Sequence, residues 1–157
     1  MNQFFELFNF APGLKVLEVT SHSDSFSHQL YEFLSSNEAE LVINRYGENH
    51  EDVKAKYVDI PTLNAPFRAF AREYKYIILR DILDIHKNPK KLIDFTYHSL
   101  ENAAFIIVVQ SKKSELHVEE IKQMLDDAEF RATNDIDILE DYHVVMAKKL
   151  HMWGNGL

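Results

Sequence analysis

The sequence predicts an α/β fold: a doubly wound, mostly parallel sheet of seven strands whose last strand is antiparallel. Three observations lead to this class. Short apolar runs alternate with amphipathic helical patterns about five times along the chain, as in a sheet covered by helices on both faces. The runs are continuously apolar, which is typical of buried parallel strands. Two strand-like segments near the end are separated only by Glu140 and Asp141, and so short a connection requires an antiparallel hairpin.

The strands are expected in short segments that are rich in apolar or β-branched residues. These segments are residues 16–19, 40–44, 56–60, 76–79, 105–109, 136–139 and 142–147. Pro61 ends the third of them, because proline has no backbone N–H to donate to a neighbouring strand.

Three helices are expected from apolar residues that recur on one face. The first contains Phe26, Leu30 and Leu34, at a spacing that places them on one side of a helix, and Ser23, Asp24 or Ser25 is its expected N-cap. The second runs from Pro89 to about residue 100, with Asn88 as N-cap. The third contains Val118, Ile121, Leu125 and Ala128. Residues 47–56 and 66–74 are weaker helix predictions.

Length and composition predict one domain spanning residues 1–157, with residues 1–13 as an N-terminal extension and residues 151–157 as a C-terminal tail. No apolar run approaches the roughly 18 residues of a membrane span, and the first residues lack the basic region of a signal peptide. There is no cysteine, which excludes disulfides, thiolate catalysis and Cys-ligated zinc. A cytoplasmic protein without a membrane partner is therefore expected.

Charge and glycine content exclude several kinds of partner and site. The net charge is −8, so nucleic acid is not an expected partner, because phosphate contacts need a basic surface. The four glycines, Gly13, Gly47, Gly154 and Gly156, leave no place for a Walker loop or a G-x-G-x-x-G fingerprint. The eight histidines form no H-x-x-x-H or H-E-x-x-H motif, so no metal site is expected.

The order of these segments resembles that of the class I S-adenosylmethionine-dependent methyltransferases, a Rossmann-like family, over about residues 14–149. "LKVLEV" is similar to the family's first strand, and "YKYIILRDILDIHKNPKKLIDFTYHSLENAAFIIVV" to its fourth strand, the next helix and its fifth strand. "EEIKQMLDDAEF" is similar to the helix before the final hairpin, and "YHVVMAKK" to the antiparallel seventh strand. The resemblance implies a methyltransferase-like fold and makes S-adenosylmethionine the possible cofactor, although none is firmly expected.

The resemblance also assigns candidate cofactor-binding positions. These are Glu18, Thr20, His22, Asn44, Asp59, Arg80 and Asp81. The family's glycine-rich loop falls on Thr20, His22 and Asp24, and its ribose-binding acidic residue falls on Asn44. Its residue on the adenine side, after the third strand, falls on Asp59. Side chains at positions that need φ > 0 cost roughly 1 kcal/mol each in strain or blocked volume, so the loop is interpreted as degenerate. Glycines expected near Asn102 and Ala103 and at Glu129 are also absent.

Two functions follow from this pattern. The favoured one is a non-catalytic or weakly binding interaction or structural module, with no catalytic residue assigned. The alternative is an active, compact methyltransferase with an unorthodox loop, which Glu18, Asp59 and Asp81 support. His86 or Asp81 is a candidate general base, although a polar strand end that leads into a helix also explains both residues. A nucleotide or flavin binder of another type explains less, since it does not account for the terminal hairpin. "SHSDSFSH" contains the letters of a hydrolase triad but is expected to be a polar loop that caps a helix.

The segment "FFELFNF", residues 4–10, is a candidate contact surface for another protein chain. Its five large apolar side chains cannot all face one side of a single helix. A homodimer or a contact with another protein is therefore expected through this segment or through Trp153, although packing on its own sheet would also bury the aromatic rings.

Overall fold

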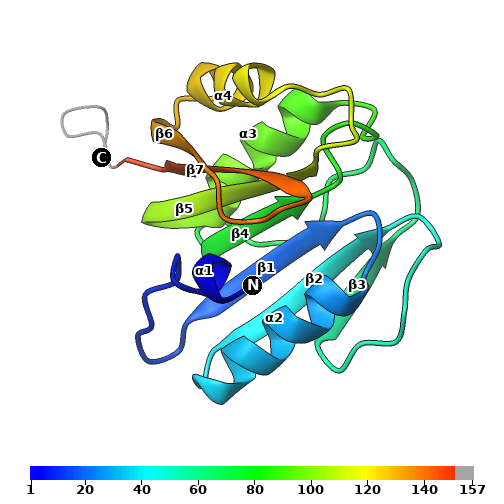
Figure 1. Ribbon diagram of the computed structural model, residues 1–157, viewed down its shortest axis with the longest axis vertical. Helices are drawn as coiled ribbons and strands as arrows, with labels where there is room; N and C mark the ends of the chain where they lie inside the picture. The colour runs from blue at the N-terminus through cyan, green and yellow to red at the C-terminus, as the bar shows by residue number, and fades with distance from the viewer. Residues whose placement is uncertain (151–157) are drawn as a thin grey trace.

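The computed structural model, described here for residues 1–150, contains a seven-stranded sheet in the order β3-β2-β1-β4-β5-β7-β6 (Figure 1). The strands are β1 Lys15–Thr20, β2 Glu40–Tyr46, β3 Lys56–Ile60, β4 Tyr74–Arg80, β5 Leu100–Ser111, β6 Arg131–Ile136 and β7 Tyr142–Lys148. β1 to β5 pair in parallel, and β7 is antiparallel to both β5 and β6. The fold class predicted from the sequence is thereby confirmed.

Helices cover both faces of the sheet (Figure 1). α1 Asn2–Phe5 and α2 Ser25–Ser36 lie on one face, and α3 Pro89–Ser99 and α4 Val118–Asp127 lie on the other. Asp24 is the N-cap of α2, and its Oδ1 accepts a hydrogen bond from the Phe26 amide at 3.1 Å. Asn88 caps α3, with Pro89 at the first helical position. Both caps were among those that the sequence predicted.

Three local predictions are wrong. Residues 66–74 form no helix: Phe67 packs edge-on against Phe95 of α3, and the Arg68 amide donates to Oδ1 of Asn44 at 2.8 Å. Residues 47–56 form no helix either. The final hairpin exists, but β6 ends at Ile136 and the connection to β7 is longer than two residues, because Leu139 turns into the core instead of extending the strand.

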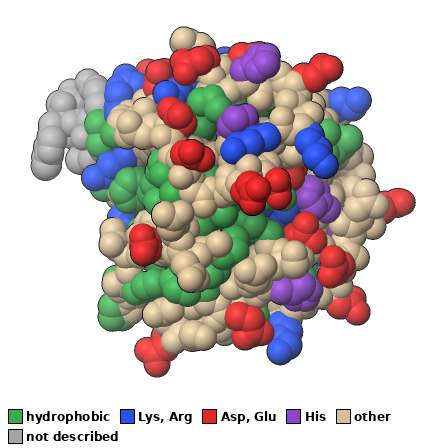
Figure 2. Space-filling model, in the orientation of Figure 1, with side chains coloured by type: hydrophobic (Ala, Val, Ile, Leu, Met, Phe, Trp, Pro, Cys, Tyr) green, Lys and Arg blue, Asp and Glu red, His purple; other side chains and the backbone are tan. Residues whose placement is uncertain are grey.

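The aromatic N-terminal segment packs mostly on its own chain. Phe4 and Phe8 are buried, and the Phe5 ring stacks on that of Phe33 with centroids 4.1 Å apart. Phe10 keeps 39 % of its surface exposed. Hydrophobic side chains therefore still gather on the face that carries α1 (Figure 2). The homodimer or partner contact stays a prediction. Because Phe4 and Phe8 are buried in the chain itself, this segment exposes less apolar surface to a partner than the sequence suggested. Trp153 lies outside the described residues. No helix within residues 1–150 is long and apolar enough to cross a membrane.

Candidate functional site

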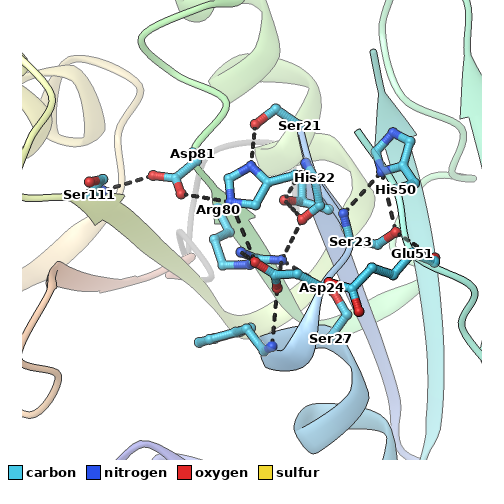
Figure 3. A network of polar contacts seen from close by, with 12 residues as sticks. Ser21, His22, Ser23, Asp24, Ser27, His50, Glu51, Arg80, Asp81 and Ser111 are labelled. Carbon is cyan, nitrogen blue, oxygen red and sulfur yellow. Dashed lines mark hydrogen bonds and ion pairs between the residues drawn. The ribbon is translucent and has the colours of Figure 1, made fainter. Parts of the chain in front are cut away.

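The candidate site lies at the carboxyl ends of β1 and β4, which are neighbours in the sheet (Figure 3). β1 continues towards β2 on one side, whereas β4 continues towards β5 on the other, so the chain changes direction here. Open α/β sheets bind ligands at such a switch point. Thr20 ends β1, Arg80 ends β4, and the loop of residues 21–24 runs between them into α2.

The guanidinium of Arg80 is the centre of this site. Its Nε donates to Oε2 of Glu18 at 2.8 Å, and its Nη2 donates to the His22 carbonyl oxygen at 2.7 Å and to Ser27 Oγ at 3.2 Å. Nη2 also lies 3.1 Å from Oδ1 of Asp24. The side chains of Glu18 and Arg80 are both 0 % exposed. Burial alone would lower the pKa of Arg80, but the two carboxylates more than offset it and raise that pKa above its usual value.

The loop is tied to β4 and β5 through His22 and Asp81 (Figure 3). His22 Nε2 lies 3.3 Å from Oδ2 of Asp81, and His22 Nδ1 lies 3.0 Å from Ser21 Oγ. Oδ1 of Asp81 accepts from the Ser111 amide at 2.8 Å. The contact between Ser21 and His22 joins neighbours in one loop, and Asp81 is also engaged by β5. The arrangement holds the loop in place, and Asp24 caps α2, as the polar-loop interpretation of "SHSDSFSH" predicted.

His50 holds the other side of the loop. Its Nδ1 accepts a hydrogen bond from the Ser23 amide at 3.0 Å, and its Nε2 lies 3.1 Å from the Tyr46 carbonyl oxygen. Nδ1 must carry a lone pair to accept and Nε2 a proton to donate, so the ring is neutral in this arrangement. Burial, followed by the positive charge of Arg45, lowers the pKa of His50. No sequence pattern indicates this contact, because His50 lies in a polar stretch without periodicity.

The backbone of the loop does not carry the expected strain. None of residues 20–24 has a positive φ, and Asp24 is extended at φ −150°. The expectation of strain at Thr20 and His22 was therefore wrong, because the loop follows a course that ordinary residues adopt. Positive φ occurs instead at Ala103 (64°) and Glu129 (73°), two places where the resemblance led us to expect glycine.

Asn44 and Asp59 lie apart from the network around Arg80. The Asn44 side chain is buried, and its Oδ1 accepts from the Arg68 amide. Asp59, on β3, binds Arg45 through both carboxylate oxygens at 2.8 and 3.2 Å, and this hydrogen bond is the main reason that the pKa of Asp59 is lowered. Arg45 and Asp59 line a hollow of about 690 Å³ with Gly47, Glu48, His50, Ile60 and Pro61. Arg45 was not among the candidate residues predicted from the sequence, although it directly follows Asn44.

His86 does not face this network. Its Nε2 lies 3.1 Å from the Ala65 carbonyl oxygen, and its Nδ1 accepts from the Asn88 amide at 2.9 Å. With both ring nitrogens engaged, the histidine holds the start of α3 against the 61–73 segment. Within residues 1–150, no group of three or more His, Asp or Glu side chains is arranged to hold a metal ion.

Comparisons with known proteins agree with the topology. No family model matches the sequence, and no curated protein is significantly similar to it. Among solved structures, the CurJ carbon methyltransferase is similar with a TM-score of 0.73 and 12 % identity, over 94 % of this chain and 51 % of that one. A SAM-dependent methyltransferase from Aquifex aeolicus has a TM-score of 0.70 and 14 % identity, over 95 % and 89 % of the two chains.

A third similar structure is the [4+2]-cyclase SpnF, with a TM-score of 0.69 and 8 % identity, over 96 % of this chain and 81 % of that one. This chain thus spans about half the length of the CurJ chain and most of the other two. At such low identity the likeness concerns the fold, and one fold can host unrelated functions. The protein has the fold of the class I S-adenosylmethionine-dependent methyltransferases.

Proposed function

We propose that this protein is a non-catalytic or at most weakly cofactor-binding member of the methyltransferase fold that works as an interaction module. One observation carries the proposal: the Arg80 guanidinium lies fully buried against Glu18 at the carboxyl ends of β1 and β4. Both oxygens of this carboxylate already accept hydrogen bonds, from Arg80 and Ser27, and solvent cannot reach them, so Glu18 offers no accessible acceptor to a cofactor.

The other residues that the resemblance assigned to the cofactor are also engaged. Thr20 is buried, and its Oγ1 bonds to the His22 backbone. Asn44 and Asp59 bind the Arg68 amide and the Arg45 side chain. Opening the contacts of Thr20 and Asn44 to admit S-adenosylmethionine would leave buried polar groups without partners, at a cost of about 1–3 kcal/mol for each group. The Asp59 side chain is exposed, so opening its pair with Arg45 costs less.

The start of α2 adds an electrostatic argument. A helix N-terminus binds anions, because its first amide groups are unpaired and the helix dipole is positive there. Here Asp24 supplies the anion from the chain itself, and Arg80 contacts that carboxylate. A ligand carboxylate at this place would compete with Asp24. These residues do not fit S-adenosylmethionine.

The alternative, an active compact methyltransferase, has one observation in its favour. The hollow beside Arg45 and Asp59 lies where β2 and β3 end, on the side where the resemblance places the adenine contact. A nucleoside could enter there while Arg80 stays in place. In both cases we regard residues 1–157 as one cytoplasmic domain, with no nucleic acid partner.

Extraction of the purified protein separates the two functions. The protein is denatured, and the supernatant is analysed by mass spectrometry for S-adenosylmethionine and S-adenosylhomocysteine. We expect neither compound above the level found with a carrier protein prepared identically. Stoichiometric cofactor in the wild-type extract would reject the proposal and support the active enzyme.

A further inference from the structure

The connection between β3 and β4 leaves a groove on the side of the sheet that carries α3. Parallel strands are usually joined through a helix, but residues 61–73 contain none. The flank of α3 beside this segment is therefore open, with a groove of about 390 Å³. It is lined by Pro66, Leu92 and Phe95 together with the polar residues Asn64, His86, Lys91, Asp94 and His98. We call it the α3 groove.

Both walls of the α3 groove are held in place. The Lys87 amide donates to the Leu63 carbonyl oxygen at 2.8 Å, and the Arg72 amide donates to that of His98 at 2.9 Å. These bonds fasten the 61–73 segment to the start and the end of α3. A groove that is already formed needs little ordering when a ligand binds, which favours affinity.

The two segments that flank the groove carry an excess of positive charge on an acidic protein, although Lys91 and Asp94 are the only Lys, Arg, Asp or Glu residues that line the groove itself. Residues 61–73 and 85–99 contain five Lys or Arg and two Asp or Glu, whereas the whole chain has 17 basic and 25 acidic residues. Lys15 holds Glu73 at 2.6 Å, and Lys90 lies 3.8 Å from Asp94. Four cations of the walls form no ion pair with any described carboxylate; they are Arg68, Arg72, Lys87 and Lys91.

Phe70 is an exposed aromatic side chain in the same segment. It keeps 80 % of its surface accessible, more than any other exposed large hydrophobic residue among those described. Its amide is held by Oε1 of Glu73 at 2.8 Å. An exposed aromatic ring close in sequence to Arg68 and Arg72 combines the residue types that are enriched at protein interfaces.

We propose that the α3 groove binds an acidic peptide segment of a partner protein. Carboxylates of the peptide face Arg68, Lys87 and Lys91, and one bulky apolar side chain enters the groove against Phe95. Charge complementarity selects an acidic occupant, and the apolar floor favours a peptide side chain over a phosphate backbone. This inference rests on the proposed function, because it names the partner class of the interaction module.

The test begins with a library of random heptapeptides displayed on phage and selected on the immobilised wild-type protein. We expect enriched peptides to combine Asp or Glu with a Leu or an aromatic residue. A synthetic enriched peptide is then measured by fluorescence anisotropy. The double variant Arg68→Glu/Lys91→Glu should weaken its binding at least about tenfold, and Phe70→Ser several-fold. Lys112→Glu/Lys113→Glu, an equal charge change at two exposed positions outside the groove, should leave affinity within about twofold.

The inference would be overturned by the absence of enriched peptides, by enrichment of basic peptides, or by equal weakening in the Lys112→Glu/Lys113→Glu control. Tighter binding of a single-stranded RNA oligonucleotide than of the acidic peptide would also overturn it. Titration of the same preparation with S-adenosylmethionine keeps this result apart from the proposed function. Peptide binding together with tight cofactor binding would retain the groove and reject the non-catalytic role, and absence of both would reject the groove alone.

Discussion

Nε of Arg80 lies 2.8 Å from Oε2 of Glu18, and neither side chain is exposed to solvent. The two residues are 62 positions apart in the sequence, so the pair joins the ends of β1 and β4. Each buried ion loses several kcal/mol of hydration, which only well-placed partners offset. Removing one partner therefore affects stability far more than removing an exposed ion pair.

We expect Arg80→Ala to lower the free energy of unfolding by about 3–5 kcal/mol, because it leaves the Glu18 carboxylate buried without its partner. Urea denaturation measures this change. The matched control is Lys90→Ala, whose ion pair with Asp94 is exposed and should contribute less than about 1 kcal/mol.

A double substitution keeps this test informative even if Arg80→Ala does not fold. Glu18→Gln/Arg80→Met removes both charges and keeps similar volume, so it should recover most of the lost stability. Equal losses for Arg80→Ala and Lys90→Ala, or no recovery in the double variant, would show that the pair does not hold β1 to β4.

The pH dependence of stability should include a contribution from His50. The pKa of His50 is lowered in the folded protein from its ordinary value of 6.5. As the pH falls below 6.5, the unfolded chain therefore takes up the proton before the folded protein does. Stability is then complete above that value and decreases as the pH falls towards the folded-state pKa. Urea unfolding between neutral and mildly acidic pH should show this decrease in wild type and in His98→Gln, but a smaller one in His50→Gln. Identical slopes for the two variants would contradict the role of the contact between Ser23 and His50.

Glu129 follows the end of α4 with a φ of 73°, a conformation that favours glycine. Glu129→Gly should raise the midpoint of thermal unfolding, with a gain of about 0.4–1 kcal/mol at most, since glycine also loosens the unfolded chain. Gln123→Gly, in the middle of α4, should instead cost about 1 kcal/mol. If both variants were destabilised equally, the backbone at Glu129 would not be strained.

Substitutions at Phe8 and Phe10 distinguish a role of the N-terminal segment in core packing from a role in association. Phe8 is 5 % exposed and Phe10 is 39 % exposed. Phe8→Ala should therefore lower stability by about 3–5 kcal/mol, whereas Phe10→Ala should cost much less. If the predicted homodimer forms through this segment, Phe10→Ala should weaken it, as seen by sedimentation equilibrium at roughly 100 μM. A monomeric wild-type protein at that concentration would reject the dimer.

Most of the sheet could be predicted because most of its strands are marked by apolar runs in the local sequence. The apolar runs at residues 105–109 and 142–147 are both strands, and the caps Asp24 and Asn88 mark helix starts. β6 was misplaced because its residues, RATNDI, are mostly exposed at the edge of the sheet and show no apolar pattern. Residues 66–74 looked helical, but contacts of Phe67 and Arg68 with α3 and Asn44 decide their course.

The site was predictable only in part. Glu18, His22, Arg80 and Asp81 were identified as candidates, and the structure brings them together. Their mutual pairing could not be read from the sequence, because it depends on which strands become neighbours. Asn44 and Asp59 were assigned by the same resemblance, yet their side chains bind other partners, since the resemblance says nothing of the amide of Arg68 or the guanidinium of Arg45.

Calorimetric titration of the wild-type protein with S-adenosylmethionine tests most directly whether the buried pair of Glu18 and Arg80 prevents cofactor binding. With Glu18, Asp24 and Ser27 engaged by Arg80, we predict no saturable heat, which corresponds to a dissociation constant weaker than about 1 mM. A dissociation constant in the low micromolar range would contradict this interpretation and would identify the chain as a cofactor-binding methyltransferase with an adapted loop.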